Sequence, residues 1–234
     1  MNELERVLKY IPDTAGKLIV TDGVFSMGGD IARLPDICKL AEKYNAGVLV
    51  DDAHGVGMIG KEGNGTASHF GLEDKVDIIM TTFSKSLASL GGCIAANSTI
   101  INYIKHKSRP FIFSASIPPS NAAAALEALR IIRSEPQRIQ NLMNVAEHMR
   151  RRLAAANIPF GNSETAIIPI MTYDTIRTLK ITHELLECGV YVNPVIAPAV
   201  PEGQCLLRTS YTATHTIEQI DRAADIIIDV FSEM

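Results

Sequence analysis

Gly47-Val48-Leu49-Val50-Asp51-Asp52-Ala53-His54-Gly55 is the stretch of this 234-residue sequence that decides the fold. Its first four residues form an apolar run without polar alternation, and the run stops abruptly at two carboxylates and a histidine. An apolar strand without alternation is typical of a parallel or mixed sheet whose two faces are both covered by helices. The polar residues that follow such a strand lie at the sheet edge where α/β proteins bind their ligands.

Comparable patterns flank this stretch and predict an alternation of strands and helices. An amphipathic helix is predicted over residues 2–8, and a second helix over residues 35–44, where Pro35 suits the first turn. Three further apolar runs predict strands, at residues 17–21, 76–81 and 92–96. Strands that alternate with helices indicate an α/β fold.

The last part of the chain follows a different pattern. After Pro118-Pro119, a long helical stretch is predicted over about residues 120–155, with a kink or break at Pro136 because proline lacks the backbone donor. Gly189 suits the end of a further helix, and Thr216-Ile217-Glu218-Gln219 is a capping box that opens a final helix. We therefore predict a C-terminal part of the large domain (1–118), a connecting helical segment (119–155) and a small α+β domain (156–234), with strands at 166–172 and 205–211 and a helix at 175–188.

Composition excludes several classes of function. The chain is 47% hydrophobic and 21% charged with a formal net charge of −4, which is ordinary for a soluble protein and gives no footprint for nucleic-acid binding. Its four cysteines lie far apart in the sequence, so neither a metal site nor a disulfide framework is indicated. No apolar run approaches the length of a membrane helix, and no signal peptide precedes the first helix. We expect a soluble, cytoplasmic protein.

Three chemically useful side chains follow two of the predicted strands. Asp51 and His54 come after the strand 47–50, and Lys85 comes after the strand 76–81, 34 positions beyond Asp51. That spacing is about one β-α-β unit, so all three can reach the same sheet edge. Taken singly, each is more often a surface charge, a cap or a structural group. Together they indicate a reactive site with an acid, an imidazole and an amine.

A set of ordered motifs carries a resemblance to a known family. Five segments resemble motifs of the α-oxoamine synthases and occur in the same order. They are Asp22 to Met27, Asp51 to Gly55, Thr82 to Ser86, Phe113 to Pro119 and Leu207 to Thr209. The α-oxoamine synthases are fold-type I enzymes that depend on pyridoxal 5'-phosphate (PLP), and they include serine palmitoyltransferase, 8-amino-7-oxononanoate synthase and 2-amino-3-ketobutyrate CoA ligase. The match runs over essentially the whole chain. It implies an aspartate aminotransferase-like α/β fold, with a mainly parallel sheet and a small α+β C-terminal domain.

The resemblance implies a role for each matching residue around the cofactor. Lys85 would hold PLP covalently and move protons at the substrate α-carbon, since a desolvated amine suits both tasks. Asp51 would pair with the ring nitrogen and keep the ring an electron acceptor. His54 and Ser26 would hydrogen-bond the phenolic oxygen and orient the ring.

The remaining roles concern the phosphate, the substrate and a partner subunit. Thr82 would bind the phosphate through its hydroxyl, and Ser114 would reach the phosphate of the neighbouring subunit in a homodimer. Arg208 would clamp the amino-acid carboxylate with its two-pronged guanidinium. The implied reaction is a decarboxylative Claisen condensation of an amino acid with an acyl-CoA, which gives an α-amino ketone.

The sequence also departs from the family pattern. Gly28 stands where many relatives have an acidic residue, and Ala115 stands where a phosphate-binding threonine is common. Family members carry a further N-terminal portion, so we expect the 234 residues alone to bind PLP weakly and to have little synthase activity. Another fold-type I activity, such as an aminotransferase, and a catalytically inactive fragment or partner subunit stay open. Residues 189–194 and 197–201 look closer to bacterial serine palmitoyltransferase-like members than to short-acyl ones.

Overall fold

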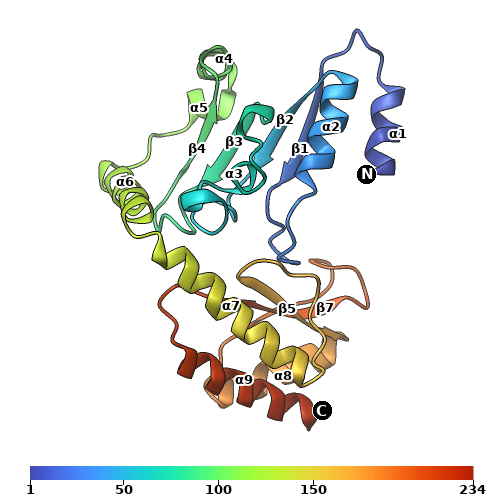
Figure 1. The fold of residues 1–234 in the computed structure, drawn as a ribbon, viewed down its shortest axis with the longest axis vertical. Helices are drawn as coiled ribbons and strands as arrows, with labels where there is room; N and C mark the ends of the chain where they lie inside the picture. Colours follow the sequence, from blue (N-terminus) through green and yellow to red (C-terminus); the bar gives the residue numbers. More distant parts are fainter. Residues whose placement is uncertain (234) are drawn as a thin grey trace. The chain divides into compact units, whose positions relative to one another are not determined.

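The computed structural model describes residues 1–233, which form two compact units (Figure 1). Unit 1 comprises Met1–Val24 and Ala32–Pro136. Unit 2 comprises Phe25–Ile31 and the chain from Gln137 onward. None of the helices in the described residues combines the length and the apolar character needed to cross a bilayer.

Unit 1 is built on a four-stranded sheet in which the strands follow one another in chain order. The strands are β1 (Lys17–Asp22), β2 (Ala46–Asp51), β3 (Ile78–Thr82) and β4 (Gly92–Ala96). β1, β2 and β3 pair in parallel, and β4 pairs with β3 in the antiparallel direction. The predicted mainly parallel sheet is confirmed. The direction of β4 follows from the short connection after β3, which has no crossover helix.

Helices pack against this sheet, and the sequence predicted only some of them. α1 (Asn2–Tyr10) and α2 (Leu34–Tyr44) lie where amphipathic periodicity predicts them. Short helices of three to five residues show no periodicity and were not predicted, and the ten-residue helix Ser98–Lys107 was not predicted either. The other helices of unit 1 are η1 (Lys61–Gly63), α3 (Thr66–Phe70), η2 (Glu73–Lys75), α4 (Ser98–Lys107), α5 (Arg109–Phe113) and α6 (Pro119–Ser134).

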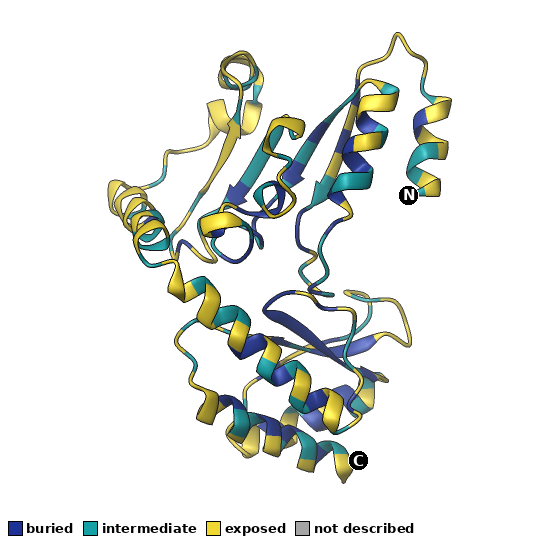
Figure 2. Ribbon diagram, in the orientation of Figure 1, coloured by how far each residue is buried: buried dark blue, intermediate teal, exposed yellow. Residues whose placement is uncertain are grey.

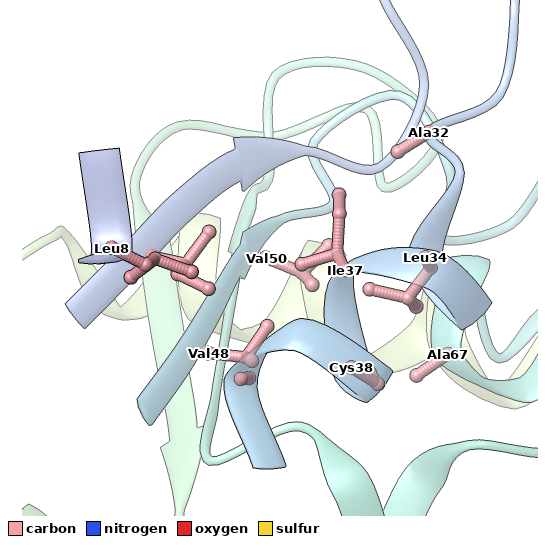
Figure 3. Close-up of a cluster of buried hydrophobic side chains, with 10 residues drawn as sticks. Leu8, Ala32, Leu34, Ile37, Cys38, Val48, Val50 and Ala67 are labelled. Carbon is pink, nitrogen blue, oxygen red and sulfur yellow. The ribbon is translucent and has the colours of Figure 1, made fainter. Parts of the chain in front are cut away.

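The core of unit 1 lies between α2 and one face of the sheet. Figure 3 shows Leu34, Ile37 and Cys38 of α2 against Val48 and Val50 of β2. Alternate residues of a strand point to the same face, so the apolar run of β2 places both valines on the helix side. Burial of side chains of this size stabilises the unit by about 1.5–3 kcal/mol each.

The opposite face of the sheet is open at its edges. Leu18 and Val20 of β1 are 55% and 62% exposed, although the parallel run predicts burial on both faces. Figure 2 shows β4 almost entirely as exposed ribbon, and Ile94 on that strand is 40% exposed. The prediction that the strands are buried on both faces was wrong for β1 and β4, because no part of residues 1–233 covers these side chains.

A pair of matched substitutions tests the open face. Val20→Thr keeps the branched shape that suits a strand and gives water a hydroxyl to solvate. We expect less light scattering at high protein concentration, with the free energy of unfolding changed by under about 0.5 kcal/mol. Val50→Thr on the neighbouring strand buries its hydroxyl and should cost about 1–3 kcal/mol. Equal effects of the two substitutions on unfolding would contradict this description of the sheet.

Unit 2 is an α+β arrangement on a three-stranded antiparallel sheet. Its strands pair in the order β5 (Ile167–Tyr173), β7 (Cys205–Ser210), β6 (Asn193–Val195). Its helices are α7 (Gln137–Ala155), α8 (Thr175–Glu187) and α9 (Ile217–Ser232), and α7 and α9 pack against each other. β6 has three residues, one of them proline, and was not predicted.

Three local signals of the sequence are confirmed. α6 ends at Ser134 and α7 begins at Gln137, so the helical stretch breaks at Pro136. Gly189 follows α8 with a φ of +84°, the left-handed conformation of a helix end. The capping box of α9 is formed in both directions between Thr216 and Gln219.

One short segment belongs to unit 2 although its neighbours in the chain belong to unit 1. In this segment, residues 25–31, the Gly29 carbonyl accepts hydrogen bonds from Thr165 Oγ1 at 2.9 Å and from the Glu164 amide at 3.2 Å. The Ser26 carbonyl accepts one from Arg208 Nε at 2.6 Å. These non-local contacts decide the assignment, and no local pattern could have shown them.

Candidate active site

Two carboxylates end the first two strands side by side. The register of the parallel pair places Asp22 opposite Asp51, and the Gly23 amide donates to the Asp51 carbonyl at 2.7 Å. Met80 of β3 pairs with Asp51, so Thr82, two residues further along, points to the same face. The carboxyl ends of β1, β2 and β3 therefore present Asp22, Asp51 and Thr82 on one face of the sheet.

The loop after β2 is held by its own backbone. The Ala53 amide donates to Asp51 Oδ1 at 3.1 Å, which fixes the carboxylate at the start of the turn. The amides of Gly55 and Val56 both donate to the Asp52 carbonyl at 3.0 Å. This turn carries His54, which is half-buried and takes part in an interaction of its own.

The Asp52 side chain fixes the same loop through hydrogen bonds to Thr66 of α3. Its side chain is fully buried, Oδ2 accepts from the Thr66 amide at 2.7 Å, and Oδ1 accepts from Thr66 Oγ1 at 2.6 Å. Burial raises the pKa of Asp52, and the two hydrogen bonds from Thr66 oppose that rise. A buried carboxylate that is hydrogen-bonded in this way holds the Asp51-to-His54 turn against α3.

The loop after β3 presents Lys85. The Lys85 side chain is exposed, while its neighbour Ser86 donates from Oγ to the Val56 carbonyl at 2.7 Å. Ser89 donates from Oγ to the Asn121 carbonyl at 2.7 Å, which ties the far end of the loop to α6. The Ser86 bond joins the Lys85 loop to the loop that carries His54.

Asp22 lies within electrostatic reach of both the predicted acid and the predicted amine. Burial raises the pKa of Asp22, and the nearby Asp51 carboxylate raises it further, while the Lys85 ammonium lowers it. Both groups must lie within Coulombic reach of the same carboxyl to have these effects. The structure therefore brings Asp51 and Lys85 to one end of the sheet, as their positions after adjacent strands predict.

Thr82 has a property that a structural threonine rarely shows. Its Oγ1 is shielded from solvent and has no hydrogen-bond partner among the described residues. Leaving a buried hydroxyl unpaired costs about 1–3 kcal/mol. Such an atom is expected where a ligand supplies the missing partner.

The other predicted residues lie elsewhere in the two units. Ser26 and Arg208 meet in unit 2, where Arg208 donates to the Ser26 carbonyl at 2.6 Å and to Ser210 Oγ at 2.8 Å. Burial lowers the pKa of Arg208. Ser114 is exposed just after α5, and no hydrogen bond within residues 1–233 joins it to Asp51 or Lys85.

Two residues of this region had no assigned role in the sequence reading. Asp22 ends β1 as Asp51 ends β2, and the two residues pair in the register. Because each aspartate follows an apolar run, the sequence alone could have indicated Asp22 as a site residue. Asp52 gave no such signal, because its partner Thr66 lies 14 positions away in a helix too short to predict.

Comparison with known proteins supports the motif reading. The chain is 47% identical over 233 residues to a serine palmitoyltransferase of Sphingobacterium spiritivorum, covering all of this chain and 58% of that protein. It is 43% identical over 235 residues to an 8-amino-7-oxononanoate synthase of Alkaliphilus oremlandii, covering all of this chain and 60% of that protein. The chain thus spans about three-fifths of the length of these curated relatives. The predicted resemblance to the α-oxoamine synthases is confirmed.

Solved structures agree with the fold. A structure of SPT with its PLP internal aldimine superposes with a TM-score of 0.96 at 34% identity, covering 99% of this chain and 59% of that chain. The serine palmitoyltransferase of Sphingomonas wittichii superposes with a TM-score of 0.95, also at 34% identity, covering 98% of this chain and 58% of that chain. The predicted fold class is confirmed. Residues 1–227 match the model of the family described as aminotransferase class I and II, and the chain belongs to that family.

Proposed function

We propose that this chain is the catalytic part of a PLP-dependent acyltransferase that condenses an amino acid with an acyl-CoA. A carbon–carbon bond forms between the amino-acid α-carbon and the acyl carbon, coenzyme A leaves as the thiol, and the carboxylate leaves as carbon dioxide and is replaced by a proton. The relatives named serine palmitoyltransferase and 8-amino-7-oxononanoate synthase support this class of reaction.

The residues of unit 1 fit the cofactor. When bound, PLP supplies a protonated ring that accepts the electrons left at the α-carbon. Asp51 would keep the ring nitrogen protonated, and His54 would orient the ring through its phenolic oxygen. The unpaired, buried Oγ1 of Thr82 suits a phosphate oxygen. Lys85, an exposed amine at the same sheet end, would hold the cofactor and carry the α-proton.

Further residues complete the proposal. Arg208 uses two of its donors on Ser26 and Ser210, and its remaining N–H groups would bind the amino-acid carboxylate. Ser26 would hydrogen-bond the phenolic oxygen, and Ser114 would bind the phosphate of a neighbouring subunit. In the same proposal the complete enzyme is a cytoplasmic homodimer, residues 1–118 belong to the large domain, 119–155 connect, and 156–234 form the small domain.

The observation that carries the proposal is the buried, unpaired Oγ1 of Thr82 at the sheet end that also presents Asp51, and the electrostatics of Asp22 agree with it. The Asp51 carboxylate and the Lys85 ammonium both act on the Asp22 carboxyl, with opposite signs. A single pyridine ring needs a carboxylate at its nitrogen and an amine at its aldehyde carbon, which are on opposite sides of one small ring. This arrangement favours a PLP site over a structural ion pair.

Selective labelling of Lys85 tests the proposal. The chain is incubated with PLP, reduced with borohydride and digested, and the modified lysines are located by mass spectrometry. We expect weak overall binding, with Lys85 labelled at lower PLP concentration than any other lysine. Lys85→Ala should lose the visible absorbance band of lysine-linked PLP, whereas Lys61→Ala, on the short helix η1, should keep it.

The outcome that contradicts the proposal is equally clear. Label spread evenly over surface lysines, or an unchanged band in Lys85→Ala, would exclude Lys85 as the cofactor lysine. Release of coenzyme A thiol is then measured for the full-length protein with glycine, alanine and serine against short and long acyl-CoAs. Amino-group transfer to a keto acid without thiol release would favour an aminotransferase instead.

A further inference from the structure

Asp22 is a carboxyl group at the sheet end to which the proposed reaction assigns no task. It ends β1 directly opposite Asp51 in the parallel register, and the two side chains point to the same face. Neighbouring strands lie about 4.8 Å apart, so two aspartates in this position can bring their carboxyl oxygens to hydrogen-bonding distance. The Gly23 amide, which donates to the Asp51 carbonyl at 2.7 Å, continues the pairing past both residues and fixes this alignment.

Two carboxylates on neighbouring strands repel each other, and a proton on one of them relieves that repulsion. Asp51 has a fixed orientation, because its Oδ1 accepts from the Ala53 amide at 3.1 Å. Asp22 has no such acceptor bond from the backbone within the described residues. It is the member of the pair better placed to hold a proton and donate it.

We propose that Asp22 is a positioning residue, whose carboxyl in its protonated form donates a hydrogen bond to Asp51 across the paired ends of β1 and β2. The inference rests on the proposed function, since Asp51 needs a defined orientation only if it meets a cofactor nitrogen. The bond would steer the second oxygen of Asp51 and keep the like charges from separating the two strand ends.

The charged groups around Asp22 agree with this assignment. Burial and the Asp51 carboxylate of β2 raise the pKa of Asp22, and the Lys85 ammonium, in the loop after β3, lowers it by a smaller effect. When folding raises the pKa of a carboxyl group, the protein loses stability as the pH rises from the ordinary pKa of that group through its raised pKa. The side chain of Asp22→Asn cannot ionise. The variant should therefore have a higher midpoint of denaturant unfolding than the unmodified chain at pH 8, and the same midpoint at pH 4.

A carbon-detected titration of the aspartate carboxyls tests the proton directly, without PLP. The resonance of Asp22 is assigned by its loss in Asp22→Asn. We expect it to titrate above the ordinary aspartate value of about 3.9. In Asp51→Asn it should move to lower pH, because the like charge is gone and the amide oxygen that remains is a weaker acceptor than a carboxylate. Asp74→Asn, an exposed position on η2, should leave the titration of Asp22 unchanged.

The results separate positioning from burial alone. If Asp22 titrates at the same pH in the unmodified chain and in Asp51→Asn, burial accounts for the shift and the proposal is wrong. Asp51→Ser serves as a second test if Asp51→Asn fails to fold, as judged from the amide spectrum. An Asp22 that titrates at the ordinary value also overturns the proposal.

The affinity for PLP supplies a second test, in which Asp22→Asn should keep the affinity that Asp22→Ala loses. Asn at position 22 keeps an N–H donor toward Asp51, so the dissociation constant of PLP should stay within about twofold. Ala removes the donor, and loss of a hydrogen bond to a charged group predicts an affinity weaker by about tenfold or more. Equal affinities in the two variants would contradict the inference. Failure of Lys85 labelling would leave the titration result standing and would count against the proposed function alone.

Discussion

Gly55→Ala is expected to destabilise the protein by about 3 kcal/mol or more, since the added methyl group has no space. A Cβ at this position would lie 1.9 Å from Asp52 Oδ1 and 2.8 Å from Thr66 Oγ1. Neither atom can yield, because the Asp52 carboxylate is fully buried and bonded to Thr66. The turn that carries His54 would have to leave its position, so binding of PLP should be lost together with stability.

The same carboxylate explains why three glycines converge here. A Cβ at Gly23 would lie 2.4 Å from Asp52 Oδ1, and one at Gly65 would lie 1.9 Å from Asp52 Oδ2. Three backbone segments thus approach the buried group closely enough to enclose it. Gly55 is the sharpest test among them. Unlike Gly65 it has no positive φ, so the effect of the substitution is steric alone, and its added Cβ would make a closer contact (1.9 Å) than one at Gly23 (2.3 Å).

Gly16→Ala is the matched control for this prediction. A Cβ at Gly16 would meet nothing within 4 Å, and its φ is not positive either. We expect its free energy of unfolding to stay within about 0.5 kcal/mol of the unmodified chain. Urea unfolding followed by circular dichroism measures both variants. A Gly55→Ala protein as stable as Gly16→Ala would show that Asp52 is not enclosed as described.

Leu185→Ala is expected to cost about 2–5 kcal/mol in unit 2, through lost burial and the cavity that remains. Leu185 is fully buried on α8, a helix that packs on all three strands of the sheet of this unit. Leu186, the next residue of the same helix, is 53% exposed. Leu186→Ala removes the same atoms from a position in contact with water.

This adjacent pair controls for residue type, helix and sequence position at once. Leu186→Ala should change the free energy of unfolding by no more than about 0.5 kcal/mol. Denaturant unfolding of both variants gives the difference, which should exceed about 2 kcal/mol. Similar losses in the two variants would mean that α8 buries a different face from the one described.

Much of the site could be predicted from the sequence because strand order and strand ends are local features. The apolar run before Asp51 and the run before Lys85 predict two strands that end at one sheet edge, and the parallel pairing of β2 with β3 confirms this. The break at Pro136 and the capping box at Thr216 were predictable for a similar reason. A proline or a cap acts on its own turn of backbone and needs no distant partner.

Pairing across the chain was decided only by the tertiary structure. The sequence shows that Asp22 and Asp51 each end a strand, but only the register of β1 on β2 puts them opposite each other. The burial of Asp52 depends on Thr66, and the placement of residues 25–31 in unit 2 depends on Thr165 and Arg208. These contacts join residues far apart in the chain, and they stabilise the protein only when the fold has brought both partners together. Local propensity therefore determined the elements and the candidate acid and amine, while non-local hydrogen bonds and packing determined which polar groups lie together and which are buried.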